Sequence, residues 1–217
     1  MIPIRDLNPH RSLPVVNLSI ILTCSLVWLY EVSLSDEGLN LFIYHYGLVP
    51  VNFLERPQTF LTHMFLHGSW LHIISNMWFL WVFGDNVEDR FGRFRYLVFY
   101  ILSGLGAAII QMLVSFLFGG ADIPMVGASG AISGVLGAYL WMFPHARILA
   151  LVPIFFFLTF MELPAVLFIG LWILIQVING LITLPLSGVG GVAWFAHIGG
   201  FVVGYLLAKR LYRRRWY

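Results

Sequence analysis

The chain has 217 residues, of which 60% are hydrophobic and only 10% are charged, and its mean hydropathy is +0.88. A water-soluble globular domain of this length needs more polar surface than that, so we expect lipid to solvate most of the chain. A formal net charge of +2 gives no indication of a nucleic-acid-binding surface.

Six apolar segments approach the roughly 20 residues that an α-helix needs to cross a bilayer. They cover residues 15–33, 69–83, 96–118, 125–143, 163–184 and 191–207. Backbone polar groups must be satisfied internally in lipid, so each segment is expected to be a helix. The sequence thus predicts an all-α, polytopic membrane protein with a six-transmembrane-helix bundle, in a single domain over residues 1–217.

The segments between these spans are polar, with one exception. A long connector covers residues 34–68, and the charged stretch 84–90 is expected to form a solvated cytosolic turn. Residues 149–161 are apolar, but Pro153 lies inside them and Glu162 follows. Because proline interrupts helices, this stretch is interpreted as an interfacial or re-entrant lead-in to the fifth span.

The basic residues predict the orientation of the spans. If both termini are cytoplasmic, only Arg56 of the twelve Lys and Arg residues lies on the outer side. This distribution follows the positive-inside rule. It places residues 1–14 and the basic tail 208–217 in the cytoplasm of a multi-pass protein of the cell (inner or plasma) membrane. The second, fourth and sixth spans then all begin at the outer face.

Polar side chains gather near the outer ends of those three spans. His72 and Asn76 lie four residues apart in the second span, hence on one helix face. Ser129 lies in the fourth span and His197 in the sixth. Counted from the expected helix starts, a rise of about 1.5 Å per residue places these four residues roughly 4–11 Å along their helices. A hydroxyl, an imidazole and an amide are therefore expected at one depth.

These side chains suit acyl transfer. Serine is a poor nucleophile until a base removes its proton, and histidine can serve as that base. Asn76, His72 and the backbone N–H of Ser129 could stabilise the oxyanion that forms. No acidic residue accompanies His197 in its span, so a Ser–His dyad is favoured over a triad.

Two glycine pairs indicate how the fourth and sixth spans could approach each other. Gly130 and Gly134 form a small-xxx-small face on the fourth span, and Gly200 and Gly204 form another on the sixth. Such faces allow helix backbones to pack closely. Close packing would bring the serine within hydrogen-bonding reach of the histidine.

With these motifs, the chain resembles the rhomboid family of intramembrane serine proteases, in its bacterial six-helix form. The resemblance rests on GASG at residues 127–130, HIISN at 72–76 and AHIGGF at 196–201. The run at residues 63–92 is also similar to the family throughout. Order and spacing agree over residues 60–204, about two thirds of the chain.

The resemblance implies a six-helix bundle in which Ser129 is the nucleophile and His197 the general base. It also implies that His72, Asn76 and the Ser129 amide surround the oxyanion, in a water-accessible cavity open to the outside. The motif glycines that would support this site are Gly127, Gly130, Gly199 and Gly200. The family needs no cofactor or metal, and its partners are transmembrane protein substrates, cut near small residues within membrane lipid. The oligomeric state stays open.

The chain departs from the family pattern at two positions. Thr59 stands where an arginine often precedes the outer-loop segment, and Ser133 stands where some members have a tyrosine packed against the base. The packing partner of His197 is therefore left open. Gln176 and Asn179 of the fifth span are expected to make structural hydrogen bonds, and a role beside a moving gate is the alternative.

Three other interpretations compete with the protease. A catalytically silent relative that binds membrane clients would be expected to lack the serine or the base. A small transporter or channel would be expected to carry charges near the bilayer centre. A metal site could use His63, His67 and His72 together with His197, but no carboxylate lies at that depth. His63 and His67 are therefore expected to anchor the loop by hydrogen bonds.

Overall fold

The computed structural model describes residues 1–9, 11–154, 156–189 and 191–212, so the end of the expected basic tail, residues 213–217, lies outside the described part. Helices dominate the described residues, as predicted. One small three-stranded sheet accompanies them, which the all-α expectation did not include.

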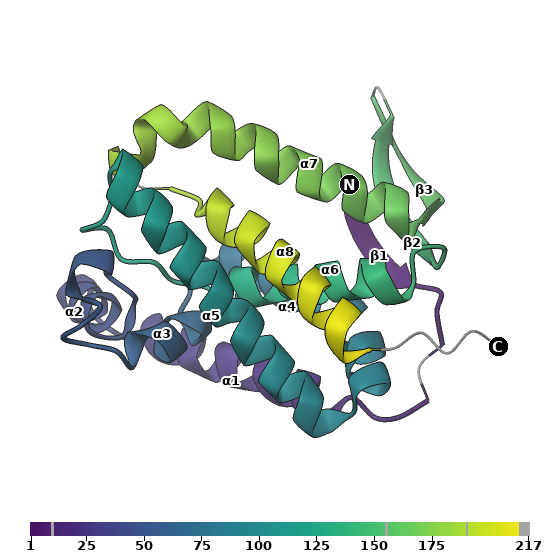
Figure 1. Ribbon diagram of the computed structural model, residues 1–217, viewed down its shortest axis with the longest axis horizontal. Coiled ribbons are helices and arrows are strands. Elements are labelled where there is room, and N and C mark those ends of the chain that lie inside the picture. Colours follow the sequence, from purple (N-terminus) through teal and green to yellow (C-terminus); the bar gives the residue numbers. More distant parts are fainter. Residues whose placement is uncertain (10, 155, 190, 213–217) are drawn as a thin grey trace.

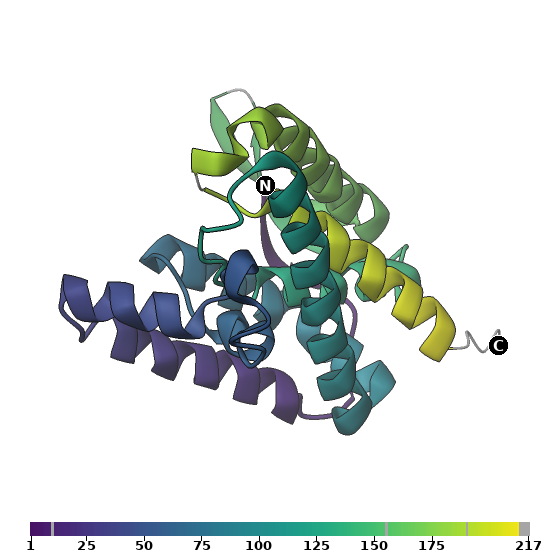
Figure 2. The same ribbon diagram turned by 60° about the vertical axis from the view of Figure 1, so that its left-hand side comes forward.

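The helices are α1 (Val15–Glu31), α2 (Asp36–Tyr46), α3 (Thr59–Thr62), α4 (Trp70–Phe91), α5 (Arg93–Phe118), α6 (Ser129–Met142), α7 (Ala165–Thr183) and α8 (Trp194–Leu211), with 3-10 turns η1 (Pro50–Asn52), η2 (His63–Phe65) and η3 (Leu184–Val189). Figures 1 and 2 show α6 in the middle of the molecule and α7 at its edge. Every residue from Gly130 to Tyr139 is buried.

Glycines bring the backbones of α6 and α8 together. A Cβ atom on Gly200 would overlap the carbonyl oxygen of Gly130, and one on Gly204 would overlap the backbone of Gly134. The close approach expected from these two glycine pairs is therefore present. It leaves no room for any side chain larger than hydrogen at these positions.

The charged stretch after the second span is not a solvated turn, so that prediction was wrong. Helix α4 continues to Phe91, and Asn86 and Glu88 are buried. The Glu88 carboxylate accepts hydrogen bonds from the backbone N–H groups of Val16 (3.1 Å) and Asn17 (2.7 Å). A helix N-terminus has unpaired N–H groups and a partial positive charge, so this carboxylate caps α1 and the helix extends to reach it.

The sheet consists of β1 (Ile2–Asp6), β2 (Arg147–Ile154) and β3 (Phe157–Pro164), all antiparallel in the order β1-β2-β3. Pro153 indicates a helix end in the sequence, but it lies in β2 beyond the residues that pair with β1, where one side of the strand is an edge and proline is tolerated. The pairing of β2 with the distant N-terminal strand could not be anticipated from local pattern. At the base of the β2–β3 hairpin, Arg147 and Glu162 form an ion pair of 3.5 Å.

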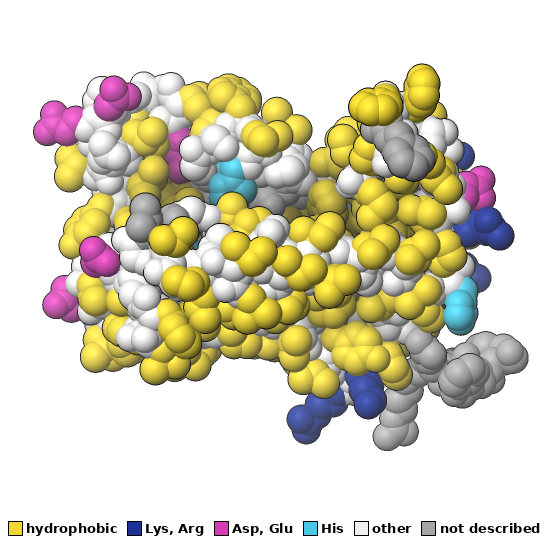
Figure 3. Space-filling model, turned by 90° about the horizontal axis from the view of Figure 1, so that it is seen from above, with side chains coloured by type: hydrophobic (Ala, Val, Ile, Leu, Met, Phe, Trp, Pro, Cys, Tyr) yellow, Lys and Arg dark blue, Asp and Glu magenta, His cyan; other side chains and the backbone are white. Residues whose placement is uncertain are grey.

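Within the described residues, two helices are long and apolar enough to cross a bilayer by length and composition, over Arg93–Phe118 and Ala165–Leu186. Val15–Glu31 and Ser129–Met142 are shorter apolar helices. In Figure 3, hydrophobic side chains are spread over the visible face, most of the visible acidic side chains lie towards the left, and the Lys and Arg side chains lie towards the right edge and the bottom.

The packing of α6 on α8 leads to a stability prediction. Gly204→Ala places a methyl group against the backbone of Gly134, which cannot move away cheaply. We expect the free energy of unfolding in mixed detergent micelles to fall by about 1–3 kcal/mol. Gly170→Ala is the matched control, because a Cβ atom there meets nothing within 4 Å. It should change the free energy little or raise it slightly; equal losses in both variants would contradict the packing argument.

Candidate active site

Ser129 is the first residue of α6, and the backbone before it is irregular. The fourth span was expected to begin at residue 125, but Gly127 has φ +123°, so the helix starts only at Ser129. The backbone N–H of Gly127 donates to the His63 carbonyl at 2.8 Å, which ties this segment to the connector. The first N–H groups of a helix have no intrahelical partner, so the Ser129 amide is available to a ligand.

The Ser129 hydroxyl meets the imidazole of His197. The distance from Ser129 Oγ to His197 Nε2 is 2.8 Å, although the two residues lie on different helices, α6 and α8. This is the proximity that the sequence predicted. The pair can transfer a proton directly, because the distance is that of an ordinary hydrogen bond.

The other ring nitrogen of His197 bonds to Gln176 on α7. The distance from His197 Nδ1 to Gln176 Oε1 is 2.8 Å, and only 6% of Gln176 is exposed. This contact is not predicted by the sequence, from which Gln176 is expected to make a structural hydrogen bond. The available signal was its position as a polar side chain inside an apolar span, which is costly without a partner.

Two indole rings pack against the His197 ring. The Trp172 centroid lies 6.1 Å away with the planes at 32°, and the Trp194 centroid lies 6.0 Å away with the planes at 86°. These tryptophans are the packing partners of His197 that the sequence left open. Ser133 is not one of them, because its hydroxyl donates to the Ser129 carbonyl at 2.7 Å.

His72 directs a donor towards the Ser129 turn. The backbone N–H of Gly68 donates to His72 Nδ1 at 3.3 Å, so in the neutral ring Nε2 carries the proton. A Cβ atom added to Gly127 would lie 2.7 Å from His72 Nε2 and 3.7 Å from Ser129 Oγ. The Nε2 atom of His72 therefore lies near the turn at Gly127 that precedes the nucleophile.

Asn76 is the second predicted oxyanion residue. It is buried in α4, one turn after His72, and its side-chain nitrogen has no hydrogen-bond partner among the described residues. A buried amide without a partner is costly, so such a group calls for an explanation. A donor that receives its acceptor only during the reaction provides one.

A cavity of about 20 Å³ adjoins Ser129 on the side of α5. It is large enough for one water molecule. On the same side, Gln111 of α5 accepts a hydrogen bond of 3.1 Å from the backbone N–H of Ala196, which satisfies an amide at the start of α8. Gln111 was not singled out from the sequence.

The connector histidines hold the backbone around the site. The ring of His63 bonds through Nδ1 to the Thr59 carbonyl at 2.8 Å, as expected for an anchoring role. For His67 it is the backbone N–H that bonds, to the Glu31 carboxylate at 3.1 Å. Among the residues that the structure describes, no group of three or more His, Cys, Asp and Glu side chains is arranged to hold a metal.

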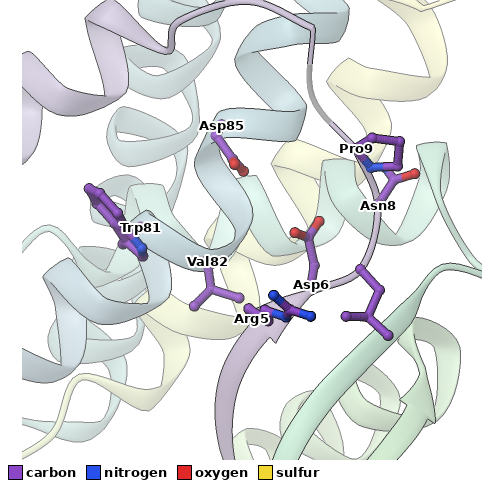
Figure 4. Close-up of a pocket in the computed structure, with 8 residues that line it drawn as sticks. Arg5, Asp6, Asn8, Pro9, Trp81, Val82 and Asp85 are labelled. Carbon is purple, nitrogen blue, oxygen red and sulfur yellow. The ribbon is translucent and has the colours of Figure 1, made fainter.

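A separate cavity of about 380 Å³ lies near the other end of α4. Figure 4 shows Asp6 and Asp85 on either side of it, with Trp81 further along α4. The Asp6 carboxylate accepts hydrogen bonds from Asn86 and Tyr139, both at 2.7 Å. These bonds fasten the N-terminal strand to the bundle, away from the Ser129 end.

Comparison with known proteins gives a consistent result. Residues 55–214 match the family model described as Rhomboid domain. The chain is 37% identical over 152 residues to RHOMBOID-like protein 4 of Arabidopsis thaliana, which covers 70% of this chain and 33% of that protein. It is 31% identical over 153 residues to RHOMBOID-like protein 6, mitochondrial, of the same plant, covering 68% and 41% of the two chains.

A similar protein is also found in yeast. The chain is 30% identical over 112 residues to Rhomboid protein 1, mitochondrial, of Saccharomyces cerevisiae, which covers 51% of this chain and 32% of that protein. The chain thus spans about a third to two fifths of the length of these relatives.

The connector histidines lead to a prediction on pH. Burial lowers the pKa of His63 from its usual 6.5 to about 4. The unfolded chain therefore binds a proton at His63 between these values and the folded chain does not. The stability that neutral His63 contributes is complete above about pH 6.5 and is lost as the pH falls towards 4, by about 3 kcal/mol at most.

We expect His63→Gln to flatten this part of the pH profile of the unfolding free energy. A residual slope should remain, since burial also lowers the pKa of His67, to about 3. His145→Gln is the matched control, because that side chain is exposed. An unchanged slope in His63→Gln would contradict the assignment.

Proposed function

The chain belongs to the rhomboid family, whose members are integral membrane proteins, and on that premise we propose that it is a serine endopeptidase that hydrolyses peptide bonds in or next to transmembrane segments of other membrane proteins. The observation that carries the proposal is the 2.8 Å contact between Ser129 Oγ and His197 Nε2. A catalytically silent relative would not need a serine hydroxyl and an imidazole hydrogen-bonded to each other.

The reaction follows from the pair. His197 Nε2 removes the hydroxyl proton while Ser129 Oγ attacks the carbonyl carbon of the scissile peptide bond. The tetrahedral intermediate collapses as the C–N bond breaks, and His197 gives its proton to the leaving amine. A water molecule, deprotonated by the same imidazole, then attacks the ester, and Ser129 regains its proton as the new carboxyl group leaves.

The oxyanion of the intermediate would lie among three donors. These are the Ser129 backbone N–H at the start of α6, the Nδ2–H group of Asn76 and the Nε2–H group of His72. The orphaned Asn76 amide supports this role, because it gains an acceptor only when negative charge develops on the substrate oxygen. The partial positive charge at the N-terminus of α6 favours that charge further.

We further propose that α1, α4, α5, α6, α7 and α8 are the six spans, with both termini on the cytoplasmic side of the cell membrane. Arg90, Arg93, Arg147 and Lys209 belong to the helix ends and hairpin at one end of the molecule, where the positive-inside rule favours the cytoplasm. The active site would then open to the outer side.

Substrate would enter laterally between α4 and α7. Two ring contacts join these helices, Phe79 with Trp172 at 6.4 Å and Phe83 with Phe168 at 6.1 Å. Side-chain contacts of this kind can separate without breaking backbone hydrogen bonds. A substrate helix that unwinds locally at this seam could present its carbonyl group to Ser129.

Cleavage of a single-span model substrate by the purified protein in detergent tests the proposal. Ser129→Ala and His197→Ala should abolish cleavage, because one removes the attacking oxygen and the other its base. Asn76→Ala should lower kcat by about 100- to 1,000-fold, as removal of one oxyanion donor does elsewhere. Ser19→Ala is the control, since that hydroxyl is exposed and its one hydrogen bond among the described residues is to the Val15 carbonyl of its own helix. A Ser129→Ala protein that still cleaves at the wild-type rate would rule the proposal out.

A further inference from the structure

We propose that Gln176 is a positioning residue for the base, which fixes the tautomer and the orientation of the His197 ring. This inference rests on the proposed function. It adds a third, neutral member to the Ser129–His197 pair and places it on α7, the helix at the edge of the molecule.

The orientation of the Gln176 amide follows from its two hydrogen bonds. Its Nε2 group lies 3.2 Å from the Trp172 carbonyl oxygen, and a carbonyl oxygen can only accept. The amide nitrogen therefore faces Trp172, and the amide oxygen faces His197. The backbone of α7 itself determines which end of the amide the imidazole meets.

That orientation in turn fixes the proton on His197. The Gln176 Oε1 atom can only accept, so His197 Nδ1 must carry the hydrogen of the 2.8 Å bond. A neutral imidazole has one N–H group, which leaves a lone pair on Nε2. This lone pair faces the Ser129 hydroxyl at 2.8 Å. The hydrogen bonds that run from the Trp172 carbonyl through Gln176 and His197 to Ser129 thus leave His197 Nε2 ready to accept the serine proton.

The surroundings leave His197 few other ways to satisfy Nδ1. Trp172 and Trp194 pack against the ring, and Gln176 is buried. Without the Gln176 oxygen, Nδ1–H would be a buried donor without a partner, and the opposite tautomer would gain population. That tautomer presents an N–H group to the serine and cannot accept its proton.

A glutamine differs from the carboxylate of a triad in one respect. It orients the ring but supplies no full negative charge to the imidazolium that forms. A glutamate at the same position would retain the acceptor and add that charge. Among the titratable groups on neighbouring helices, His72 of α4 faces the same site, and α5 presents the neutral Gln111 there.

The test compares Gln176→Leu and Gln176→Glu with wild type in the cleavage assay, over a range of pH. Gln176→Leu should lower kcat about tenfold with little change in KM, as expected for the loss of one buried hydrogen bond. Gln176→Glu should recover much of kcat at high pH. A carboxylate favours the protonated imidazole. The Gln176→Glu substitution should therefore move the low-pH limb of the kcat/KM profile to higher pH, by about one to three pH units.

Two controls separate the possible outcomes. Asn179→Leu makes the same amide-to-leucine change three residues further along α7. Among the hydrogen bonds of the described residues, none joins Asn179 to His197. The Asn179→Leu protein should therefore keep the wild-type pH profile. His72 is present in every variant, so a displaced limb reports on position 176. Wild-type cleavage with an unshifted limb in Gln176→Glu would overturn the positioning role alone, whereas no cleavage by wild type would count against the proposed function.

A second inference concerns the β2–β3 hairpin and stands independently of the protease. The described residues at its tip are apolar and uncovered, with Phe156 98%, Phe157 78%, Leu158 69% and Phe160 65% exposed. The hairpin leads directly into the apolar helix Ala165–Leu186, which is long enough to cross a bilayer. Figure 1 shows it projecting at a large angle to α7.

We infer that the hairpin lies in the interfacial layer of the membrane, with its tip among lipid acyl chains near the headgroups. Strand β3 is an edge strand, since the sheet order is β1-β2-β3. Its outer N–H and C=O groups need water or headgroups, so the hairpin cannot enter the hydrocarbon core as a re-entrant element. The Arg147–Glu162 ion pair at its base also suits the interface.

Depth measurement by electron paramagnetic resonance tests this placement in proteoliposomes. The chain has one cysteine, Cys24, so a Cys24→Ala background allows single spin labels at Phe157→Cys, at Asp36→Cys in the polar start of α2 and at Leu174→Cys in the middle of α7. We expect the accessibility of the Phe157 label to oxygen and to a water-soluble nickel complex to lie between those of the other two labels. A value equal to that of Asp36 would place the hairpin in water, and one equal to that of Leu174 would place it in the core; either would overturn the inference.

Discussion

The contact between the backbones of α6 and α8 is the constraint on which the site depends. Ser129 and His197 lie on different helices, and their side chains are short, so they meet at 2.8 Å only because the helix axes are very close. Glycines on both helices permit that approach, since a methyl group at Gly200 or Gly204 would overlap the facing backbone. The close packing of α6 on α8 is therefore a condition for the hydrogen bond between Ser129 and His197.

The third helix of the site, α7, is held differently. It contacts His197 through side chains, by the hydrogen bond of Gln176 and the ring of Trp172. If α7 is displaced when a substrate helix enters between α4 and α7, these contacts to the base will change with it. The orientation of the imidazole would then depend on the position of the helix that controls access, which would link substrate entry to the readiness of the base.

The sequence predicted most of the helices and the hydrogen-bonding proximity of Ser129 and His197. Those predictions succeeded because a polar residue in an apolar span needs a reason, and Ser129 and His197 shared a depth. It did not predict the partner of His197, because a lone glutamine such as Gln176 has many possible acceptors and only the tertiary packing selects one. Two other features could not be predicted for the same reason: the cap that Glu88 provides for α1 and the pairing of β1 with β2. Each joins segments far apart in the chain.

Activation of the Ser129 hydroxyl by His197 is the central event of the proposed mechanism. The most direct measurement is mass spectrometry of the intact active protein after reaction with a fluorophosphonate, with the adduct mapped to a residue. We expect one adduct, on Ser129, formed in the wild-type protein and absent from His197→Ala. An adduct on another residue, or equal labelling of Ser129 without His197, would contradict the account.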